Sequence, residues 1–310
     1  MRPRRPGGHP GTVNALREGE CILLGNLRYL CEEISGFEKE VKLQPCEMLD
    51  TWLVRTLAPL VDLYVNDAFS AAHRNCPSMT AFQQVLPTAA GFLLFDEYKA
   101  LYNVLHGAKK PAVFVLGGAK ISDAFGMMEA VCANGTADKI LACGVTGQVM
   151  LLAQGVKLGN TTEEFLKARD LWCFVDQAKG LLSRFPDVFE LPMDLAFERD
   201  GKREEIKVEA LPAEISFCDL GAKTIAAYSA VIAQAGTIFA NGPAGVYENP
   251  LFETGTRAIW NAVANAPGYS VIGGGDTVSS ATKLADISKI DYVCTAGGAM
   301  VRFMSGKKLA

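Results

Sequence analysis

The sequence predicts an α/β protein built from parallel, doubly wound sheets, because two kinds of segment alternate along it. Short apolar runs end in glycine-rich turns, and segments of helical character, such as residues 123–133 and 222–234, lie between them. Parallel strands need long crossover connections and are covered on both faces, so they form continuous apolar runs. Since ligands in such sheets bind outside the carboxyl ends of the strands, we expect the glycine turns to line one crevice.

The N-terminal portion contains few of these segments. Strands are predicted over residues 20–24 and 61–65, with a helix over residues 48–58 between them. Two strands and one helix are too few for an independent α/β domain. We therefore expect residues 1–90 to be a partial N-terminal domain.

A long helix is predicted next. Apolar residues recur at helical spacing from residue 89 to residue 105, and Gly107 and Pro111 end the pattern. We expect residues 91–107 to form a helix that joins the N-terminal domain to the remainder of the chain.

Residues 108–310 show the clearest alternation and predict a C-terminal domain. Each predicted strand there leads into a glycine turn. The charged segment 199–209 has few apolar residues, so we expect a surface hairpin or loop in that place. The predicted strands of this domain cover residues 112–116, 139–143, 237–240, 269–272 and 291–295.

Composition limits the partners and the location of the protein. The formal net charge is −4, from 30 basic and 34 acidic residues, which argues against broad nucleic-acid binding. No apolar run reaches membrane-spanning length, and the Pro-, Gly- and Arg-rich residues 1–11 resemble a disordered end rather than a signal peptide. The nine scattered cysteines contain no C-x-x-C pair and indicate reduced, mostly buried thiols. We expect a monomeric cytoplasmic protein with no nucleic-acid or membrane partner.

The strongest candidate site is the glycine turn that follows the predicted strand 269–272. Three glycines let backbone amides approach an anion with no side chain in the way. The acid and hydroxyl after them can hold magnesium and phosphate at the start of the next helix. Glycine turns also end many parallel strands for steric reasons alone. The residues of this turn are Gly273, Gly274, Gly275, Asp276 and Thr277.

Two further candidates follow other glycine turns. Lys120 comes after Gly117 and Gly118 and could neutralise a transferring phosphoryl group, although a solvated lysine at a helix start has the same pattern. Glu248, which follows the run that begins at Asn241, could accept hydrogen bonds from ribose hydroxyls or be an ordinary surface acid. The P-loop fingerprint is absent, and so is the G-x-G-x-x-G of dinucleotide-binding dehydrogenases.

Arg28 and Arg74 are the candidates in the N-terminal portion, where each is placed just beyond a predicted strand. The planar guanidinium suits bidentate capture of a phosphate or a carboxylate. A structural ion pair is the competing interpretation for each arginine. His73, beside Arg74, is interpreted as structural because no nucleophile or acid motif accompanies it.

Six motifs in this order resemble those of the phosphoglycerate kinase family. They span most of the chain, from about residue 19 to about residue 309, and such a series does not arise by chance. The wording of the second motif is closest to the archaeal branch. The motifs are GNLR at 25–28, VNDAF with AHR at 65–74, LGGAK at 116–120, NGPAGVYE at 241–248, GGGDT at 273–277 and TAGGA at 295–299.

The resemblance implies two Rossmann-like domains joined by a helix. It places 3-phosphoglycerate on the N-terminal domain and Mg-ATP on the C-terminal domain. The reaction would be reversible phosphoryl transfer between 1,3-bisphosphoglycerate and ADP, giving 3-phosphoglycerate and ATP in glycolysis and gluconeogenesis. An acceptor carboxylate is already ionised at neutral pH, so this chemistry needs positioning and charge neutralisation rather than a general base.

The same resemblance implies a role for each matching residue. Arg28 and Arg74 would bind the substrate phosphate, Asp276 would hold Mg²⁺, and Lys120 would be catalytic together with Gly297 and Gly298. The nucleotide would be bound by Gly117, Gly118, Lys120, Asn241, Pro243, Glu248, Gly273, Gly274, Gly275, Asp276 and Thr277.

Departures from the family pattern concern the N-terminal side most. The family's opening strand, a catalytic arginine and an H-x-G-R segment have no counterpart before Glu20. We therefore expect a member that is N-terminally truncated or has a mis-called start. Within the motifs, Gly25 replaces Glu and Ala296 replaces Gly. A catalytically impaired nucleotide-binding remnant of the family is the alternative function, and an unrelated dehydrogenase is disfavoured by its missing fingerprint.

Overall fold

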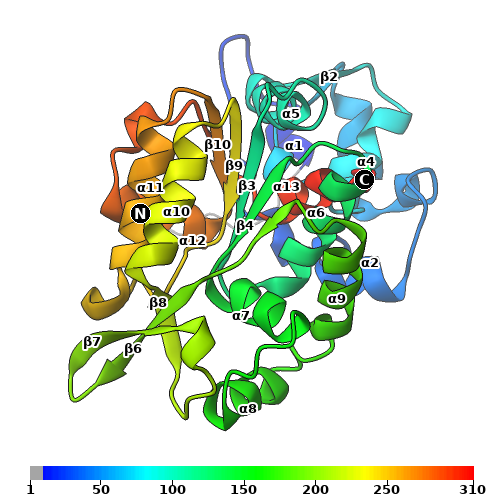
Figure 1. The fold of residues 1–310 in the computed structure, drawn as a ribbon. Helices are drawn as coiled ribbons and strands as arrows, with labels where there is room; N and C mark the ends of the chain where they lie inside the picture. The colour runs from blue at the N-terminus through cyan, green and yellow to red at the C-terminus, as the bar shows by residue number, and fades with distance from the viewer. Residues whose placement is uncertain (1–9) are drawn as a thin grey trace. The chain divides into compact units, whose positions relative to one another are not determined.

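The computed structural model describes residues 10–310 and confirms the α/β class. The chain divides into two compact units, Met1–Asp96 with Lys308–Ala310 (unit 1) and Glu97–Lys307 (unit 2). Figure 1 shows the arrangement of the elements. The expectation of a disordered start lies almost wholly outside the described residues.

Unit 2 is organised around a six-stranded sheet with the order β11-β10-β9-β3-β4-β5. All five neighbouring pairs are parallel. The carboxyl ends of the strands therefore meet at one edge, and five of the six were predicted. The strands are β3 (Ala112–Leu116), β4 (Lys139–Ala142), β5 (Phe189–Glu190), β9 (Thr237–Asn241), β10 (Tyr269–Gly273) and β11 (Tyr292–Cys294).

Helices cover both faces of this sheet (Figure 1). On one face, α10 (Ala222–Ala233), α11 (Thr254–Asn265) and α12 (Gly275–Leu284) pack their apolar sides on the central strands, with Trp260 fully buried among them. Such burial explains why these strands are continuous apolar runs. The remaining helices of the unit are α6 (Ile121–Ala133), α7 (Gly144–Ala153), α8 (Asn160–Ala168), α9 (Phe174–Arg184) and α13 (Gly298–Met304).

A small antiparallel sheet of order β7-β6-β8 completes unit 2. Its strands are β6 (Asp194–Arg199), β7 (Lys202–Lys207) and β8 (Phe217–Leu220). The surface hairpin expected at residues 199–209 is present, with Asp200 and Gly201 at its turn in the left-handed region. Strand β8 was not predicted, and it turns out to border the candidate site.

Unit 1 holds a two-stranded parallel sheet of β1 (Tyr64–Asn66) and β2 (Thr88–Ala90). Beside it, Met48, Leu53, Val54, Ala81 and Phe82 form a small core. The helices of the unit are short: α1 (Pro10–Val13), α2 (Ser35–Glu40), α3 (Trp52–Leu57), α4 (Pro77–Thr80) and the one-turn 3₁₀ segments η1 (Leu27–Tyr29), η2 (Cys31–Glu33), η3 (Glu47–Asp50), η4 (Ala58–Leu60), η5 (Phe69–Ala71) and η6 (Phe82–Gln84).

Three predictions for unit 1 need correction. The strand predicted over residues 20–24 is wrong, because this apolar run has no partner to pair with and leaves Leu23 94% exposed. The helix predicted over residues 48–58 is interrupted at Thr51, whose backbone is extended (ψ 151°). Strand β2 was missed, since three residues of threonine and alanine carry almost no strand signal.

The predicted long helix is α5 (Phe92–His106), which contains the boundary between the two units. Its buried positions include a carboxylate, Glu97. No helix within residues 10–310 has the length and apolar character needed to cross a membrane. The cysteines are free thiols, but the expectation that most are buried is wrong: Cys76, Cys132, Cys143 and Cys294 are buried, and Cys21, Cys31, Cys46 and Cys173 are exposed.

Candidate functional site

The glycine turns at the carboxyl edge of the large sheet are hydrogen-bonded to one another. Gly117 N–H donates to the carbonyl of Asn241 at 2.9 Å, and Gly118 N–H donates to that of Pro243 at 2.9 Å. Gly144, which begins α7, donates to Ala244 at 3.1 Å. The turns after β3, β4 and β9 are therefore one connected assembly.

Two side chains connect this assembly to the turn after β10. Asn241 Nδ2 donates to the carbonyl of Gly273 at 2.7 Å, and Thr277 Oγ1 accepts from Gly242 N–H at 2.7 Å. Thr277 is only 1% exposed, and its hydroxyl already has Gly242 N–H as a hydrogen-bond partner within the protein. Gly273 itself is the last residue of β10 and lines neither of the cavities described below.

Gly242 is the closest backbone approach in this assembly. Its φ is +89°, and a Cβ built there would lie 2.2 Å from the carbonyl oxygen of Gly117. Any side chain at this position would both strain the backbone and force the β3 and β9 turns apart.

We expect Gly242→Ala to disrupt the site for this reason. The replacement should lower the free energy of unfolding by about 2 kcal/mol or more and weaken, at least about tenfold, binding of the Mg-ADP that the family resemblance implies. Denaturant unfolding and calorimetry measure the two effects. Gly201→Ala is the matched control, because Gly201 also has a positive φ (+72°) but no atom within 4 Å of a built Cβ. Equal losses in the two variants would show that backbone strain alone is responsible.

Above the connected turns lies a cavity of about 90 Å³. Helices α6 and α12 begin at it, with Lys120 and Gly274 at their N-caps and no side chain capping either helix. Free N–H groups at a helix start favour an anion. The predicted residues that line this cavity are Gly117, Gly118, Lys120, Asn241, Pro243, Gly274, Gly275, Asp276, Thr277, Gly297 and Gly298.

Lys120, Asp123 and Asp276 are the charged residues that line this cavity, and Lys120 and Asp276 face each other loosely. Lys120 Nζ lies 3.7 Å from Asp276 Oδ2, and their side chains are 74% and 66% exposed. An exposed pair at this distance contributes at most about 1 kcal/mol. Lys120 and Asp276 can therefore each leave the other and pair with a charged ligand instead.

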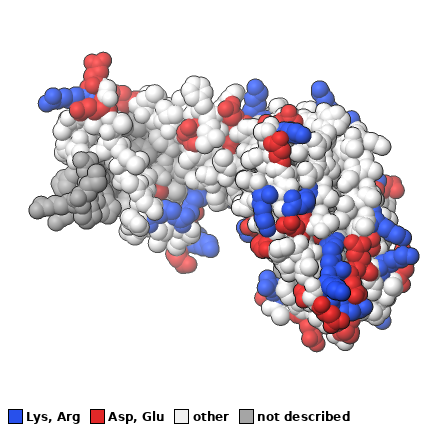
Figure 2. Space-filling view, turned by 90° about the vertical axis from the view of Figure 1, so that its left-hand side faces the viewer, with Lys and Arg blue, Asp and Glu red and all other residues white. Residues whose placement is uncertain are grey.

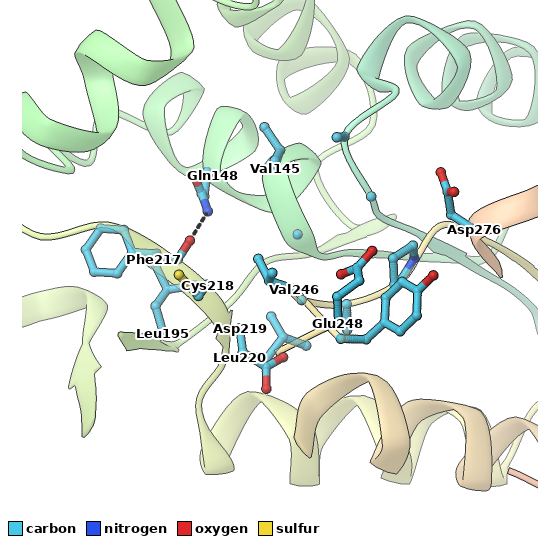
Figure 3. Close-up of a pocket in the computed structure, with 17 residues that line it drawn as sticks. Val145, Gln148, Leu195, Phe217, Cys218, Asp219, Leu220, Val246, Glu248 and Asp276 are labelled. Atoms are coloured by element: carbon cyan, nitrogen blue, oxygen red, sulfur yellow. Dashed lines mark hydrogen bonds between the residues drawn. The ribbon is translucent and has the colours of Figure 1, made fainter. Parts of the chain in front are cut away.

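A second cavity, of about 180 Å³, joins the first through Gly118, Ala119, Pro243 and Asp276. Its lining is mostly apolar (Figure 3). Glu248 borders this slot and is exposed, so its carboxylate is available to a ligand. The remaining lining comes chiefly from α7, β6, β8 and the loop before Glu248: Val145, Gln148, Leu195, Phe217, Cys218, Asp219, Leu220, Val246 and Tyr247.

Sequence reasoning missed almost all of this slot. Gln148 could have been found, because it lies one helical turn after the predicted glycine turn at Gly144. Leu195, Phe217 and Cys218 come from a segment without a recognisable motif, and only the folded arrangement of β6 and β8 brings them to the site.

A buried carboxylate fixes the end of β11. Glu97 of α5 is 0% exposed; its Oε2 accepts from Cys294 Sγ at 2.6 Å, and its Oε1 accepts from Thr295 N–H at 2.7 Å and from the Thr295 hydroxyl. Burial and the neighbouring carboxylate raise the pKa of the Cys294 thiol, which is thus the donor of its hydrogen bond. Gly297 and Gly298 follow after Ala296, so Glu97 is bound to the segment that leads into their turn.

The two predicted arginines lie together in unit 1. Arg28 Nη2 and Arg74 Nη2 both donate to Ser35 Oγ, at 3.2 and 2.9 Å. Arg74 also forms an ion pair with Glu38, and its side chain is 13% exposed. The two arginines therefore lie together, as a shared anion site requires. Arg74 also forms a structural ion pair, which was the alternative interpretation of this residue. Arg28 lies in η1 and follows no strand, contrary to expectation.

Comparisons with known proteins agree with these motifs. A family profile described as "Phosphoglycerate kinase" matches residues 9–307. The phosphoglycerate kinase of Methanothermobacter thermautotrophicus is 40% identical over 298 residues, which cover 96% of this chain and 71% of that relative. The phosphoglycerate kinase of Halobacterium salinarum is 40% identical over 304 residues, covering 97% and 74%. Both organisms are archaeal, as the second motif indicated.

Solved structures give the same result. The crystal structure of phosphoglycerate kinase from Pyrococcus horikoshii OT3 matches with a TM-score of 0.84 and 35% identity, covering 92% of this chain and 69% of that one. The enzyme structure from Coxiella burnetii matches with a TM-score of 0.74 and 35% identity, covering 84% and 67%. Nothing in these comparisons supports the alternative of a nucleotide-binding remnant. This chain belongs to the phosphoglycerate kinase family of enzymes.

Proposed function

We propose that this chain catalyses reversible phosphoryl transfer between 1,3-bisphosphoglycerate and ADP, giving 3-phosphoglycerate and ATP in glycolysis and gluconeogenesis. The observation that carries the proposal is the pair of joined cavities at the carboxyl edge of the large sheet. An apolar slot leads directly into an amide-lined cavity that contains Lys120 and Asp276, which is the arrangement that a nucleotide requires.

The apolar slot takes the base and the ribose of the nucleotide, with Glu248 accepting hydrogen bonds from the ribose hydroxyls. The phosphates occupy the smaller cavity. There the free amides at the starts of α6 and α12, and those of Gly297 and Gly298, face the phosphate oxygens.

Mg²⁺ is held by Asp276 together with the phosphates. No group of three or more His, Cys, Asp or Glu side chains within residues 10–310 could hold a metal ion by itself. Asp276 is an exposed carboxylate at the smaller cavity, which Asp123 also lines, and such a site suits Mg²⁺, which is commonly bound by one or two carboxylates plus substrate phosphates and water. When bound, the ion neutralises phosphate charge.

Lys120 and the turn at Gly297 and Gly298 carry the catalytic role. In the direction of ATP synthesis, the bond between phosphorus and the acyl oxygen breaks, and a bond to the terminal phosphate oxygen of ADP forms. The departing carboxylate is a stable anion, so no group has to protonate it. The Lys120 ammonium and the two glycine amides stabilise the charge on the transferring phosphoryl group.

Arg28 and Arg74 bind the phosphate of 3-phosphoglycerate. Their side chains already share Ser35 Oγ as an acceptor, so the two guanidiniums lie close enough to bind one anion. In this proposal the substrate phosphate shares Arg74 with Glu38 or displaces that carboxylate.

The proposed partners are small molecules, and the proposed form is a cytoplasmic monomer. Basic and acidic side chains are interspersed on the face that Figure 2 shows, which suits local phosphate recognition better than binding along a nucleic acid. The free thiols suit a reducing compartment.

A coupled assay tests the proposal. We expect ATP consumption that depends on 3-phosphoglycerate, together with Mg-ADP binding by calorimetry that is lost when EDTA removes Mg²⁺. Binding without turnover would favour the impaired nucleotide-binding remnant. A folded chain that binds no Mg-ADP would contradict both functions.

A further inference from the structure

One wall of the nucleoside slot is a loop that is hydrogen-bonded to two neighbouring elements, β8 and α11. This wall loop, residues 245–248, carries Val246 and Glu248 into the slot (Figure 3). Val246 N–H donates to the carbonyl of Cys218 in β8 at 2.8 Å, and Gly245 N–H donates to Thr256 Oγ1 in α11 at 3.1 Å. The position of the wall loop therefore depends on how β8 and α11 are joined.

Asp219, in β8, connects this strand to α11. Its side chain is completely buried, and Oδ2 accepts from Gly255 N–H, in the first turn of α11, at 2.8 Å. Among residues 10–310, Oδ1 has no hydrogen-bond partner and instead packs against two glycines. A Cβ on Gly245 would lie 2.4 Å from this oxygen, and one on Gly255 would lie 2.2 Å from it. A carboxylate thus fills the space between β8, α11 and the wall loop.

Arg203 neutralises this carboxylate from β7. Its Nη1 donates to Asp219 Oδ2 at 2.9 Å, and its Nη2 donates to the carbonyl of Leu220 at 2.7 Å. The Arg203 side chain is 17% exposed. Removing Arg203 would leave the buried Asp219 charge without compensation, whereas Arg203 also pairs with Glu205 at 3.2 Å.

We propose that Asp219 and Arg203 are positioning residues for the nucleoside end of the nucleotide. The inference rests on the proposed function and adds that these two residues serve recognition of the base and ribose and not of the phosphates. Asp219 borders the slot, but its carboxylate is completely buried beside the wall loop, and Arg203 acts through that carboxylate. Neither residue lines the smaller cavity that receives the phosphates. Loss of the pair should therefore weaken recognition of the base and ribose and spare recognition of the phosphates.

Calorimetry with two probes tests this division. In Asp219→Asn the neutral amide loses the ion pair with Arg203, which keeps its pair with Glu205 at 3.2 Å, and the amide can accept fewer hydrogen bonds. We expect the Kd of Mg-ADP to rise about tenfold and the Kd of Mg-pyrophosphate, which lacks base and ribose, to stay within about twofold. Steady-state kinetics should show a higher KM for the nucleotide, with kcat and the KM for 3-phosphoglycerate little changed.

Two further variants keep the test decisive. Arg203→Lys retains the charge but loses the fork of donors, so its effect should be intermediate. It serves as the second variant if Asp219→Asn does not fold. Asp176→Asn is the matched control, because Asp176 is 89% exposed and pairs with the exposed Lys179, one turn along α9.

The results distinguish failure of the positioning role of Asp219 and Arg203 from failure of the proposed function. A parallel loss of Mg-ADP and Mg-pyrophosphate binding would show general damage and overturn the inference. Unchanged binding of both probes would overturn it equally. If the unsubstituted chain binds no Mg-ADP, the proposed function itself falls, and the inference falls with it.

Discussion

Replacement of Lys120 by alanine is expected to lower kcat by about 10²- to 10³-fold and to leave the Kd of Mg-ADP within about threefold. Lys120 lies at the N-cap of α6, beside the amides that are proposed to receive the phosphates, and its side chain is 74% exposed. Its neighbour Asp276 holds it weakly. The ammonium is thus free to follow the phosphoryl group as charge redistributes, which makes its contribution larger in the transition state than in the ground state.

Stopped assays of 3-phosphoglycerate-dependent ATP consumption, run beside calorimetry, give both quantities. Lys179→Ala is the matched control, because Lys179 is also exposed (57%) and weakly paired but lies on α9, away from the cavities. A Lys120 variant that turns over at the rate of the unsubstituted chain would remove the lysine from the catalytic step. A large loss of Mg-ADP affinity with unchanged kcat would instead assign it to ground-state binding.

The grouping of the glycine turns around the smaller cavity could be predicted from the sequence because its information is local, and the role of these turns in phosphate binding stays a prediction. A glycine turn after an apolar strand is a short pattern, and parallel pairing then brings every such turn to one edge. Gly117, Lys120, Asn241 and Asp276 are accordingly found together around one cavity. The sequence therefore contained both the residues and the rule that assembles them.

The nucleoside slot could not be predicted because its information is not local. Cys218 and Asp219 lie in a strand with no motif, and Leu195 reaches the slot only through antiparallel pairing of β6 with β8. The apolar character of Leu195 marks it as a core residue without indicating a binding site, and an aspartate such as Asp219 is normally interpreted as a surface residue. The false strand at residues 20–24 shows the converse limit, since an apolar run forms a strand only where a partner strand is available.

The burial of Glu97 also could not be predicted from the sequence, for another reason. A glutamate on an amphipathic helix is normally interpreted as a solvated residue, and nothing in its neighbourhood in the sequence marks it as buried. Its partners Cys294 and Thr295 lie about 200 residues further on, at the end of β11. A fully buried carboxylate with three donors is costly to assemble, which indicates that the position of the turn it fixes matters to the protein.

Replacement of Glu97 by glutamine should therefore damage both stability and turnover. The amide has one acceptor oxygen where the carboxylate has two, so its NH₂ group must face either the Cys294 thiol or the donors of Thr295. Leaving a buried donor unpaired costs about 1–3 kcal/mol, which should lower the Tm by several degrees. Since the turn at Gly297 and Gly298 begins two residues after Thr295, we expect kcat to fall about tenfold or more as its amides lose their alignment.

Measurements on Glu97→Gln, Cys294→Ala and the double variant would separate the two consequences. Cys294→Ala removes the donor that glutamine leaves unpaired on that side, so it should restore much of the Tm if the NH₂ group faces the thiol. It should not restore kcat, because the hydrogen bonds to Thr295 keep their altered strength. Asp96→Asn, on the exposed face of the same helix, controls for charge. An unchanged kcat in Glu97→Gln, with a lowered Tm, would show that Glu97 supports the fold without setting the catalytic turn.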